Sequence, residues 1–120
     1  MVVNCEERFS IYVLKATVEI KEYIDRHPLA WITVNEHAVR QRVNRKDLQK
    51  CFKQQYGKKI SEYQKLKRID AACEMLLAAK MTKKEIAALC GYSNQNNFSN
   101  AFKKVKNMSP QAWQKKYGTS

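Results

Sequence analysis

Apolar residues recur every three or four positions along most of this chain, which is the period of an α-helix rather than the alternation of a β-strand. The first stripe runs through Val13, Ala16, Thr17, Ile20, Tyr23 and Ile24. Pro28 stops that helix, because a proline pushes the residue before it out of the α region. Further stripes predict helices at 45–56, 61–79 and 95–105. Only three glycines and two prolines interrupt 120 residues, so we expect an all-α chain.

Capping residues indicate where these helices begin and end. Capping boxes, in which a Thr and a Glu three residues apart each bond the other's backbone amide, occupy 33–36 and 82–85. Asn44 and Asn94 are good N-caps for the helices that follow, since an Asn side chain accepts from the open amides of the first turn. Gly57 suits the left-handed position just after a helix.

The chain contains an internal repeat with an offset of 49 or 50 residues. An offset of 49 superposes the two capping boxes. An offset of 50 pairs Asn44 with Asn94, Leu48 with Phe98, Phe52 with Phe102, Lys53 with Lys103 and Tyr63 with Trp113. We therefore expect two helix-turn-helix subdomains joined by one long linker helix. The expected divisions are an N-terminal tail at 1–8, a first subdomain at 9–60, the linker helix at 61–79 and a second subdomain at 80–120.

The second subdomain has the more regular pattern. A short helix at 86–90, a turn at Gly91 and a helix at 95–105 make a helix-turn-helix. Glycine suits the turn because it takes positive φ without a Cβ clash. On the second of these helices, Phe98 and Phe102 mark the inner face. The other face carries amides, a hydroxyl and cations, which suit base edges and phosphates in a major groove. The candidate DNA-binding residues here are Gln95, Asn96, Asn97, Ser99, Asn100, Lys103 and Lys104.

In the first subdomain the candidates project from the helix at 45–56, away from Leu48 and Phe52. They are Arg45, Lys46, Gln49, Lys50 and Lys53. A Gln amide can bond adenine with both ends and a lysine can reach guanine acceptors, whereas a solvated basic face that contacts only phosphates is the competing interpretation. Arg68, on the linker helix, is a further phosphate candidate. Trp31 and Trp113 are expected to be core anchors rather than base-stacking platforms.

Charge and composition narrow the function. The formal net charge is +12, from 23 Lys and Arg against 11 Asp and Glu, which favours nucleic acid as partner and an anionic membrane surface second. The sequence has no run of about 18 consecutive apolar residues, so we expect no insertion into a membrane. Cys5 falls in the expected tail, and three cysteines within helical stripes are expected to be small core residues: Cys51, Cys73 and Cys90. We find no metal-ligand spacing and no catalytic Ser/His/Asp or Cys/His set, so we expect no metal, no cofactor and no enzyme, with His37 structural.

Two segments carry a family resemblance. The stretch IAALCGYSNQNNFSNAFKKVKNMSP at 86–110 resembles the C-terminal signature of the DNA-binding domain of the AraC/XylS family of bacterial transcription regulators. A second marker on the linker helix is similar to that family's pattern: Arg68, Ile69, Ala72, Met75 and Leu76. Departures from the family fall at Arg42-Val43 (usually a glycine and an aromatic residue), at His37 (usually apolar) and at Lys106-Asn107 (usually an aromatic residue and glycine).

The resemblance implies about seven helices in two subdomains, whose recognition helices enter successive major grooves about one DNA turn, ~34 Å, apart. Family base-reading positions fall on Lys46, Gln49, Lys50, Gln95, Asn96 and Asn100. It implies a sequence-specific regulator that binds promoter or operator DNA in the bacterial cytoplasm and nucleoid. The resemblance further implies two partners, which are RNA polymerase and an effector-binding or sensor domain outside this chain. We take this chain to be a fragment of a longer regulator. An activator role follows the resemblance, while the residues do not distinguish activation from repression.

Two other functions stay open at this point. One is a non-specific nucleic-acid binder, which the charge alone would permit. The other is a protein-interaction module that kept the fold. Such a module predicts acids or apolar patches on the recognition faces, and neither helix is expected to show them.

Overall fold

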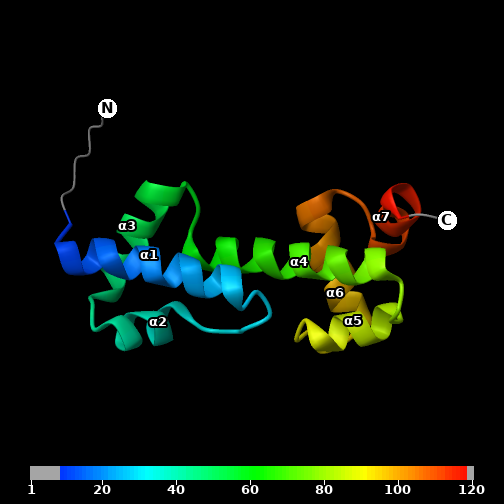
Figure 1. The fold of residues 1–120 in the computed structure, drawn as a ribbon, viewed down its shortest axis with the longest axis horizontal. Coiled ribbons are helices and arrows are strands. Elements are labelled where there is room, and N and C mark those ends of the chain that lie inside the picture. Colours follow the sequence, from blue (N-terminus) through cyan, green and yellow to red (C-terminus); the bar gives the residue numbers. More distant parts are fainter. Residues whose placement is uncertain (1–8, 119–120) are drawn as a thin grey trace. The chain divides into compact units, whose positions relative to one another are not determined.

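The computed structural model describes residues 9–118 of the 120, and within them it contains seven helices and no strand (Figure 1). The helices are α1 (Ile11–Arg26), α2 (Val34–Gln41), α3 (Arg45–Tyr56), α4 (Ile60–Ala78), α5 (Lys83–Leu89), α6 (Gln95–Lys106) and α7 (Pro110–Tyr117). The all-α prediction is confirmed. The expected tail at 1–8, with Cys5, lies outside the described residues.

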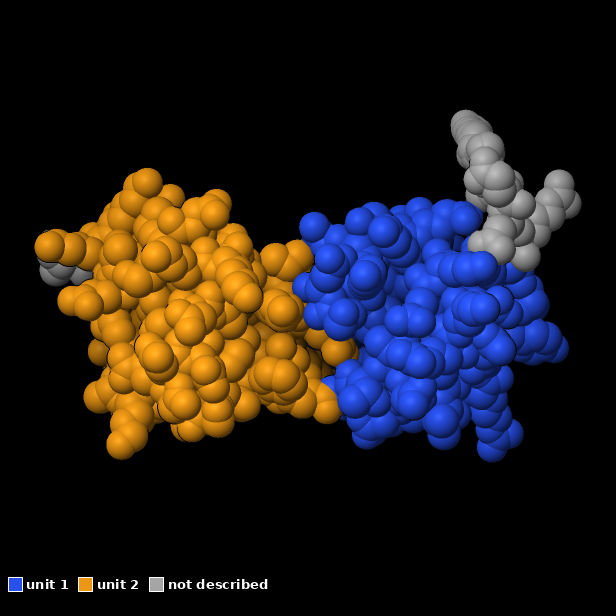
Figure 2. Space-filling model, turned by 180° about the vertical axis from the view of Figure 1, so that it is seen from behind, with its two compact units in different colours: residues 1–26, 32–63 blue, residues 27–31, 64–120 orange. Residues whose placement is uncertain are grey.

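The chain divides into two compact units (Figure 2). Within the described residues, unit 1 comprises 9–26 and 32–63, and unit 2 comprises 27–31 and 64–118. The long helix α4 therefore begins in unit 1 and continues in unit 2, and residues 27–31 of the loop between α1 and α2 belong to unit 2. The three-part division at 9–60, 61–79 and 80–120 stays a prediction.

Side-chain caps fix the start of the short helices as the sequence indicates. The Thr33 hydroxyl accepts from the Glu36 amide at 3.1 Å and the Glu36 carboxylate accepts from the Thr33 amide at 2.9 Å. Thr82 and Glu85 repeat this box at 3.1 and 2.8 Å. Because Thr82 is the N-cap, α5 starts at Lys83 and ends at Leu89, so the predicted range 86–90 was wrong by three residues at its start and one at its end.

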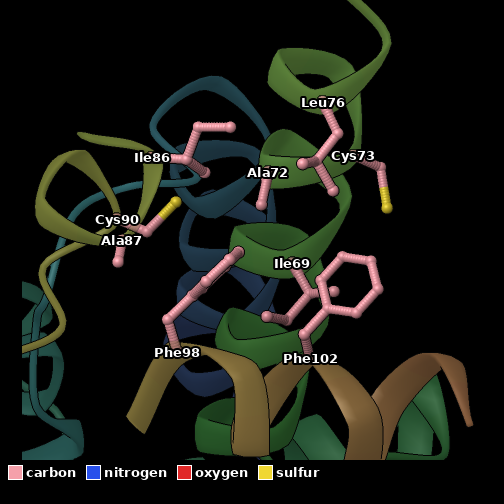
Figure 3. Packing of buried hydrophobic residues seen from close by; sticks show 9 residues of the cluster. All are labelled: Ile69, Ala72, Cys73, Leu76, Ile86, Ala87, Cys90, Phe98 and Phe102. Atoms are coloured by element: carbon pink, nitrogen blue, oxygen red, sulfur yellow. The ribbon is translucent and has the colours of Figure 1, made fainter. Parts of the chain in front are cut away.

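Each unit packs its own core, and the repeat is visible in both. In unit 1, Leu48 and Phe52 are fully buried, and the Tyr63 ring lies 5.9 Å from that of Phe52. In unit 2, α4, α5, α6 and the turn after α5 contribute the buried cluster shown in Figure 3: Ile69, Ala72, Cys73, Leu76, Ile86, Ala87, Cys90, Phe98 and Phe102. The Trp113 ring lies 6.0 Å from that of Phe102, as the 50-residue offset predicts.

The turns of the two helix-turn-helix units share one backbone geometry despite different residues. Gly91 has φ +85° and Arg42 has φ +57°, so both occupy the left-handed region. The next amide then bonds back to the first helix, Val43 N–H to the Ala38 carbonyl at 3.1 Å and Tyr92 N–H to the Ala87 carbonyl at 3.0 Å. Arg42 thus adopts the left-handed conformation that Gly91 adopts in the second unit, at the steric cost that any Cβ has there.

Trp31 covers the turn of unit 2, and this corrects one expectation. Its indole Nε1 donates to the Cys90 carbonyl at 2.8 Å, and its ring stands edge-on to Tyr92 at 5.6 Å. A Cβ added at Gly91 would lie 2.0 Å from that Nε1. Yet Trp31 is 54% exposed, so the expectation of a buried core anchor was wrong: the Nε1 edge of the indole contacts the turn while much of the ring stays at the surface.

Arg68 is the second correction. It is only 3% exposed, and its guanidinium lies 3.5 Å from the centre of the Trp31 ring. Its Nη2 also donates to the Ala30 carbonyl at 3.3 Å. A side chain held in this way cannot reach a phosphate, so the phosphate role expected for Arg68 was wrong. Its charge instead holds the 27–31 loop by stacking on the indole.

Candidate nucleic-acid interface

The outward faces of α3 and α6 are built by helical periodicity. Successive residues turn by about 100°, so residues two or five positions from the first buried anchor of each helix, Phe98 or Leu48, point away from the core. On α6 the buried Phe98 and Phe102 point toward α4 (Figure 3). The row that faces the opposite way is Asn96, Asn100 and Lys103, all exposed. On α3 the equivalent exposed row is Lys46, Lys50 and Lys53.

The other predicted residues flank these rows. Arg45 on α3 is exposed, as are Gln95, Asn97 and Lys104 on α6. Gln49 and Ser99, which the repeat pairs, are both half-buried. All twelve predicted site residues therefore lie on the two recognition helices with part or all of the side chain accessible.

The amides of α6 differ in what holds them. The Asn94 side chain caps the helix by accepting from the Asn97 amide at 2.8 Å. The Asn97 side chain donates to the Ser93 hydroxyl at 2.8 Å, so it is occupied in bracing the turn. The side chains of Asn96 and Asn100 make no hydrogen bond within the described residues. Two primary amides on the outward row are therefore available to a ligand.

The first recognition helix is more strongly charged. Asn44 caps α3 by accepting from the Lys46 and Asp47 amides at 2.8 and 3.1 Å. Asp47 is exposed in the first turn, where a carboxylate is favoured by the helix dipole. Asp47 lies about 100° around the helix from Lys46, so the outward row of α3 itself carries no acid.

A hollow of about 530 Å³ lies beside α3 and is lined only by cations and amides. Its residues are Gln49, Lys50, Lys53, Gln54 and Lys59. Sequence reasoning missed Lys58 and Lys59, although the run Gly57-Lys58-Lys59 directly after the helix was the signal. The Lys59 amide and the charges of these lysines hold the pKa of the Glu62 carboxyl below its usual range.

The described residues offer neither a metal site nor a helix that could span a membrane. Among residues 9–118, no group of three or more His, Cys, Asp or Glu is placed to hold a metal ion. His37 is buried with its ring 6.3 Å from that of Tyr23, which confirms its structural role. No helix in the described part of the chain is both long and apolar enough to cross a bilayer.

The three cysteines expected in the core are buried and free, which confirms that prediction. Burial raises the pKa of the Cys73 thiol to about 11 and raises that of Cys90 as well. These thiols are kept protonated, so they are poor nucleophiles.

Comparison with known proteins agrees with this geometry. A family profile described as "Helix-turn-helix domain" matches residues 38–116. The probable transcriptional regulator LumQ of Photobacterium leiognathi is 32% identical over 97 residues, which is 81% of this chain and 39% of that protein. The HTH-type transcriptional activator RhaR of Cronobacter sakazakii is 35% identical over 71 residues, 59% of this chain and 25% of that protein. The chain thus spans well under half of the length of these relatives.

Solved structures share the fold. The C-terminal domain of AraT, a response regulator from Geobacillus stearothermophilus, is 30% identical with a TM-score of 0.79, and the match covers 95% of this chain and 92% of that one. The DNA-binding domain of AdpA, solved in complex with a target DNA, is 20% identical with a TM-score of 0.76, over 85% of this chain and 92% of that one. With its two helix-turn-helix units and the outward rows on α3 and α6, the chain belongs to the AraC/XylS family of helix-turn-helix transcription regulators.

Proposed function

We propose that this chain is a sequence-specific double-stranded DNA-binding domain, in which α3 and α6 each enter one major groove. The observation that carries the proposal is the pair of equivalent outward rows, Lys46-Lys50-Lys53 and Asn96-Asn100-Lys103, on two helices that each follow a left-handed turn and begin at an Asn N-cap. A net charge of +12 supplies the attraction to the phosphate backbone.

The outward rows of the two units differ in side-chain chemistry, and so in the part of the DNA that each would contact. Amides discriminate between donor and acceptor patterns on base edges, whereas a lysine beside the backbone responds only to charge. We assign base reading chiefly to α6 and phosphate contact chiefly to α3, with Arg45, Gln49, Gln95, Ser99 and Lys104 on the margins of the two footprints.

The remaining parts of the proposal follow from the family. The chain acts as the DNA-binding part of a cytoplasmic regulator associated with the nucleoid, an activator that contacts RNA polymerase and receives its signal from an effector-binding or sensor domain. It performs no catalysis itself. These roles belong to a whole regulator, and the relatives are a little more than twice as long as this chain.

The decisive experiment compares affinities. Duplexes are selected from a random pool with this chain, and the dissociation constants for a selected and a scrambled duplex are measured between roughly 50 and 200 mM salt. Sequence-specific binding predicts a ratio of at least about 10³ in favour of the selected duplex. Equal affinities that fall steeply with salt would assign the chain to non-specific binders, and no binding to either duplex would favour a protein-interaction module.

Two further measurements follow from the roles of the units. Lys46→Ala should weaken binding evenly across sequences and reduce the salt slope by about one, because it removes one phosphate contact. A footprint on the selected duplex should cover two separate blocks, one for each unit. Protection of a single ~5 base-pair block would contradict reading by both units.

A further inference from the structure

The free amides of α6 specify a base pattern. Resting on the proposed function, we infer that the half-site of unit 2 contains two adenines about two base pairs apart, one bonded by Asn96 and the other by Asn100. The inference concerns which sequence this chain selects, and it can fail while specific binding itself holds.

The spacing comes from the helix. Asn96 and Asn100 lie four residues apart on the outward row, which is a rise of about 6 Å along the axis. Successive base pairs are about 3.4 Å apart, so a helix lying along the groove presents the two amides to positions about two base pairs apart. The buried Phe98 sits between them in sequence and points into the core, which fixes the direction of the row (Figure 3).

The base identity comes from the amide group. A primary amide has one acceptor oxygen and one donor nitrogen side by side. In the major groove adenine alone among the four bases presents a donor, N6, beside an acceptor, N7. Guanine presents two acceptors, which would face the amide oxygen with a lone pair, and cytosine presents only a donor. Adenine therefore satisfies both atoms of each Asn.

The structure also separates these two residues from their neighbours. The Asn97 side-chain nitrogen donates to the Ser93 hydroxyl, and Asn97 lies about 100° away from Asn96 around the helix. The third member of the row, Lys103, is a point charge with no acceptor and does not distinguish adenine. Among the residues of α6, only Asn96 and Asn100 combine an outward direction, exposure and an unengaged amide.

The repeat supplies an internal contrast. The positions in unit 1 that correspond to Asn96 and Asn100 are Lys46 and Lys50, on a helix with the same length and the same type of Asn cap. The double substitution Lys46→Asn with Lys50→Asn therefore transfers the amide pair onto α3. If the pair itself encodes the preference, the half-site of unit 1 should acquire the adenine pattern.

The test uses the full chain and duplexes selected by the wild-type protein. Changing either of the two predicted A·T base pairs to a G·C base pair should weaken binding by the wild-type protein by roughly 5- to 150-fold. Asn100→Ala should remove the preference at one of the two positions and Asn96→Ala at the other. Replacing the adenine by 7-deazaadenine, which lacks the N7 acceptor, should weaken the wild type by roughly 2- to 12-fold and the matching Ala variant not at all.

The control variant is Gln111→Ala, which removes an exposed amide on α7 and should leave the selected sequence unchanged. Helical signal and melting temperature establish that each variant is folded, and the 7-deazaadenine arm tests the wild-type protein without any substitution. The inference is overturned if the selected half-site lacks paired adenines, if 7-deazaadenine has no effect, or if both Ala variants select the wild-type sequence. Failure of the wild type to select any sequence would instead refute the proposed function.

Discussion

Gly91→Ala probes the contact between the turn of unit 2 and the indole that covers it. The added Cβ would meet Trp31 at 2.0 Å from Nε1, 2.8 Å from Cδ1 and 2.9 Å from Cε2. Contacts below 3.0 Å are not tolerated, and the opposing atoms belong to a rigid ring. The indole therefore has to leave, and with it go the hydrogen bond to the Cys90 carbonyl and the stack on Arg68.

The expected cost is a sum of three effects. Forcing a residue with a Cβ to φ +85° costs about 1–2 kcal/mol. Losing the indole hydrogen bond costs about 0.5–1.5 kcal/mol. Losing a cation–π stack on a buried guanidinium costs about 0.5–2 kcal/mol. Together they lower the free energy of unfolding by about 2–5 kcal/mol, a large part of the stability of a small domain.

Urea denaturation followed by circular dichroism measures this cost, and Gly57→Ala is the matched control. Gly57 has φ +75°, but no heavy atom lies within 4 Å of the added Cβ, so only the backbone cost of about 1–2 kcal/mol is expected. In a Trp31→Ala background Gly91→Ala should likewise cost only that amount. If Gly91→Ala costs the same with and without Trp31, or no more than Gly57→Ala, the argument from the indole is refuted.

Three further predictions concern other features. Arg42→Gly should raise the free energy of unfolding by about 1 kcal/mol, since Arg42 holds φ +57° without the freedom of glycine; an unchanged or lower urea midpoint would contradict this. The Thr33 amide holds the pKa of the Glu36 carboxyl below its usual value. The bond between them therefore contributes stability above about pH 4.5, and this contribution is lost as the pH falls through the pKa of Glu36 in the folded state. Urea midpoints between pH 6 and 3 should therefore fall less steeply for Glu36→Gln than for the wild type, and parallel curves would count against the linkage. The Cys73 thiol, with a pKa of about 11, should react far more slowly with iodoacetamide at pH 8 in the folded chain than in urea, as peptide mapping by mass spectrometry would measure; equal rates would show that the thiol is not buried.

Local signals predicted the helices well. Thr33 with Glu36, Asn44 and Gly57 each act within three or four residues of chain, and the structure shows the bonds that their positions imply. The repeat extended this accuracy to the packing of Tyr63 and Trp113, because residues equivalent in sequence met equivalent phenylalanines. Fold and recognition helices were thus accessible from the sequence.

Contacts between residues that are distant in the sequence could not be predicted from it. Trp31 meets the Cys90 carbonyl 59 residues along the chain, and no periodicity reveals that pairing. Arg68 was expected at the surface because a cation on a helix is usually solvated, yet the same indole covers it. For the candidate site, residue types identified the faces, but whether an amide is occupied, as in Asn97, depends on the side-chain geometry of the turn.

Residues 27–31 give unit 2 a discontinuous sequence, and this affects how the chain can be dissected and synthesised. A fragment beginning at residue 64 would carry α5 and α6 but lack Trp31, leaving the turn and Arg68 uncovered, so no single cut yields both units intact. During translation Trp31 emerges before α2, α3 and α4, and its partner at Cys90 follows 59 residues later. Unit 1 can complete its core first, while the contact of Trp31 with Cys90 has to await the end of α5 and the core of unit 2 has to await α6.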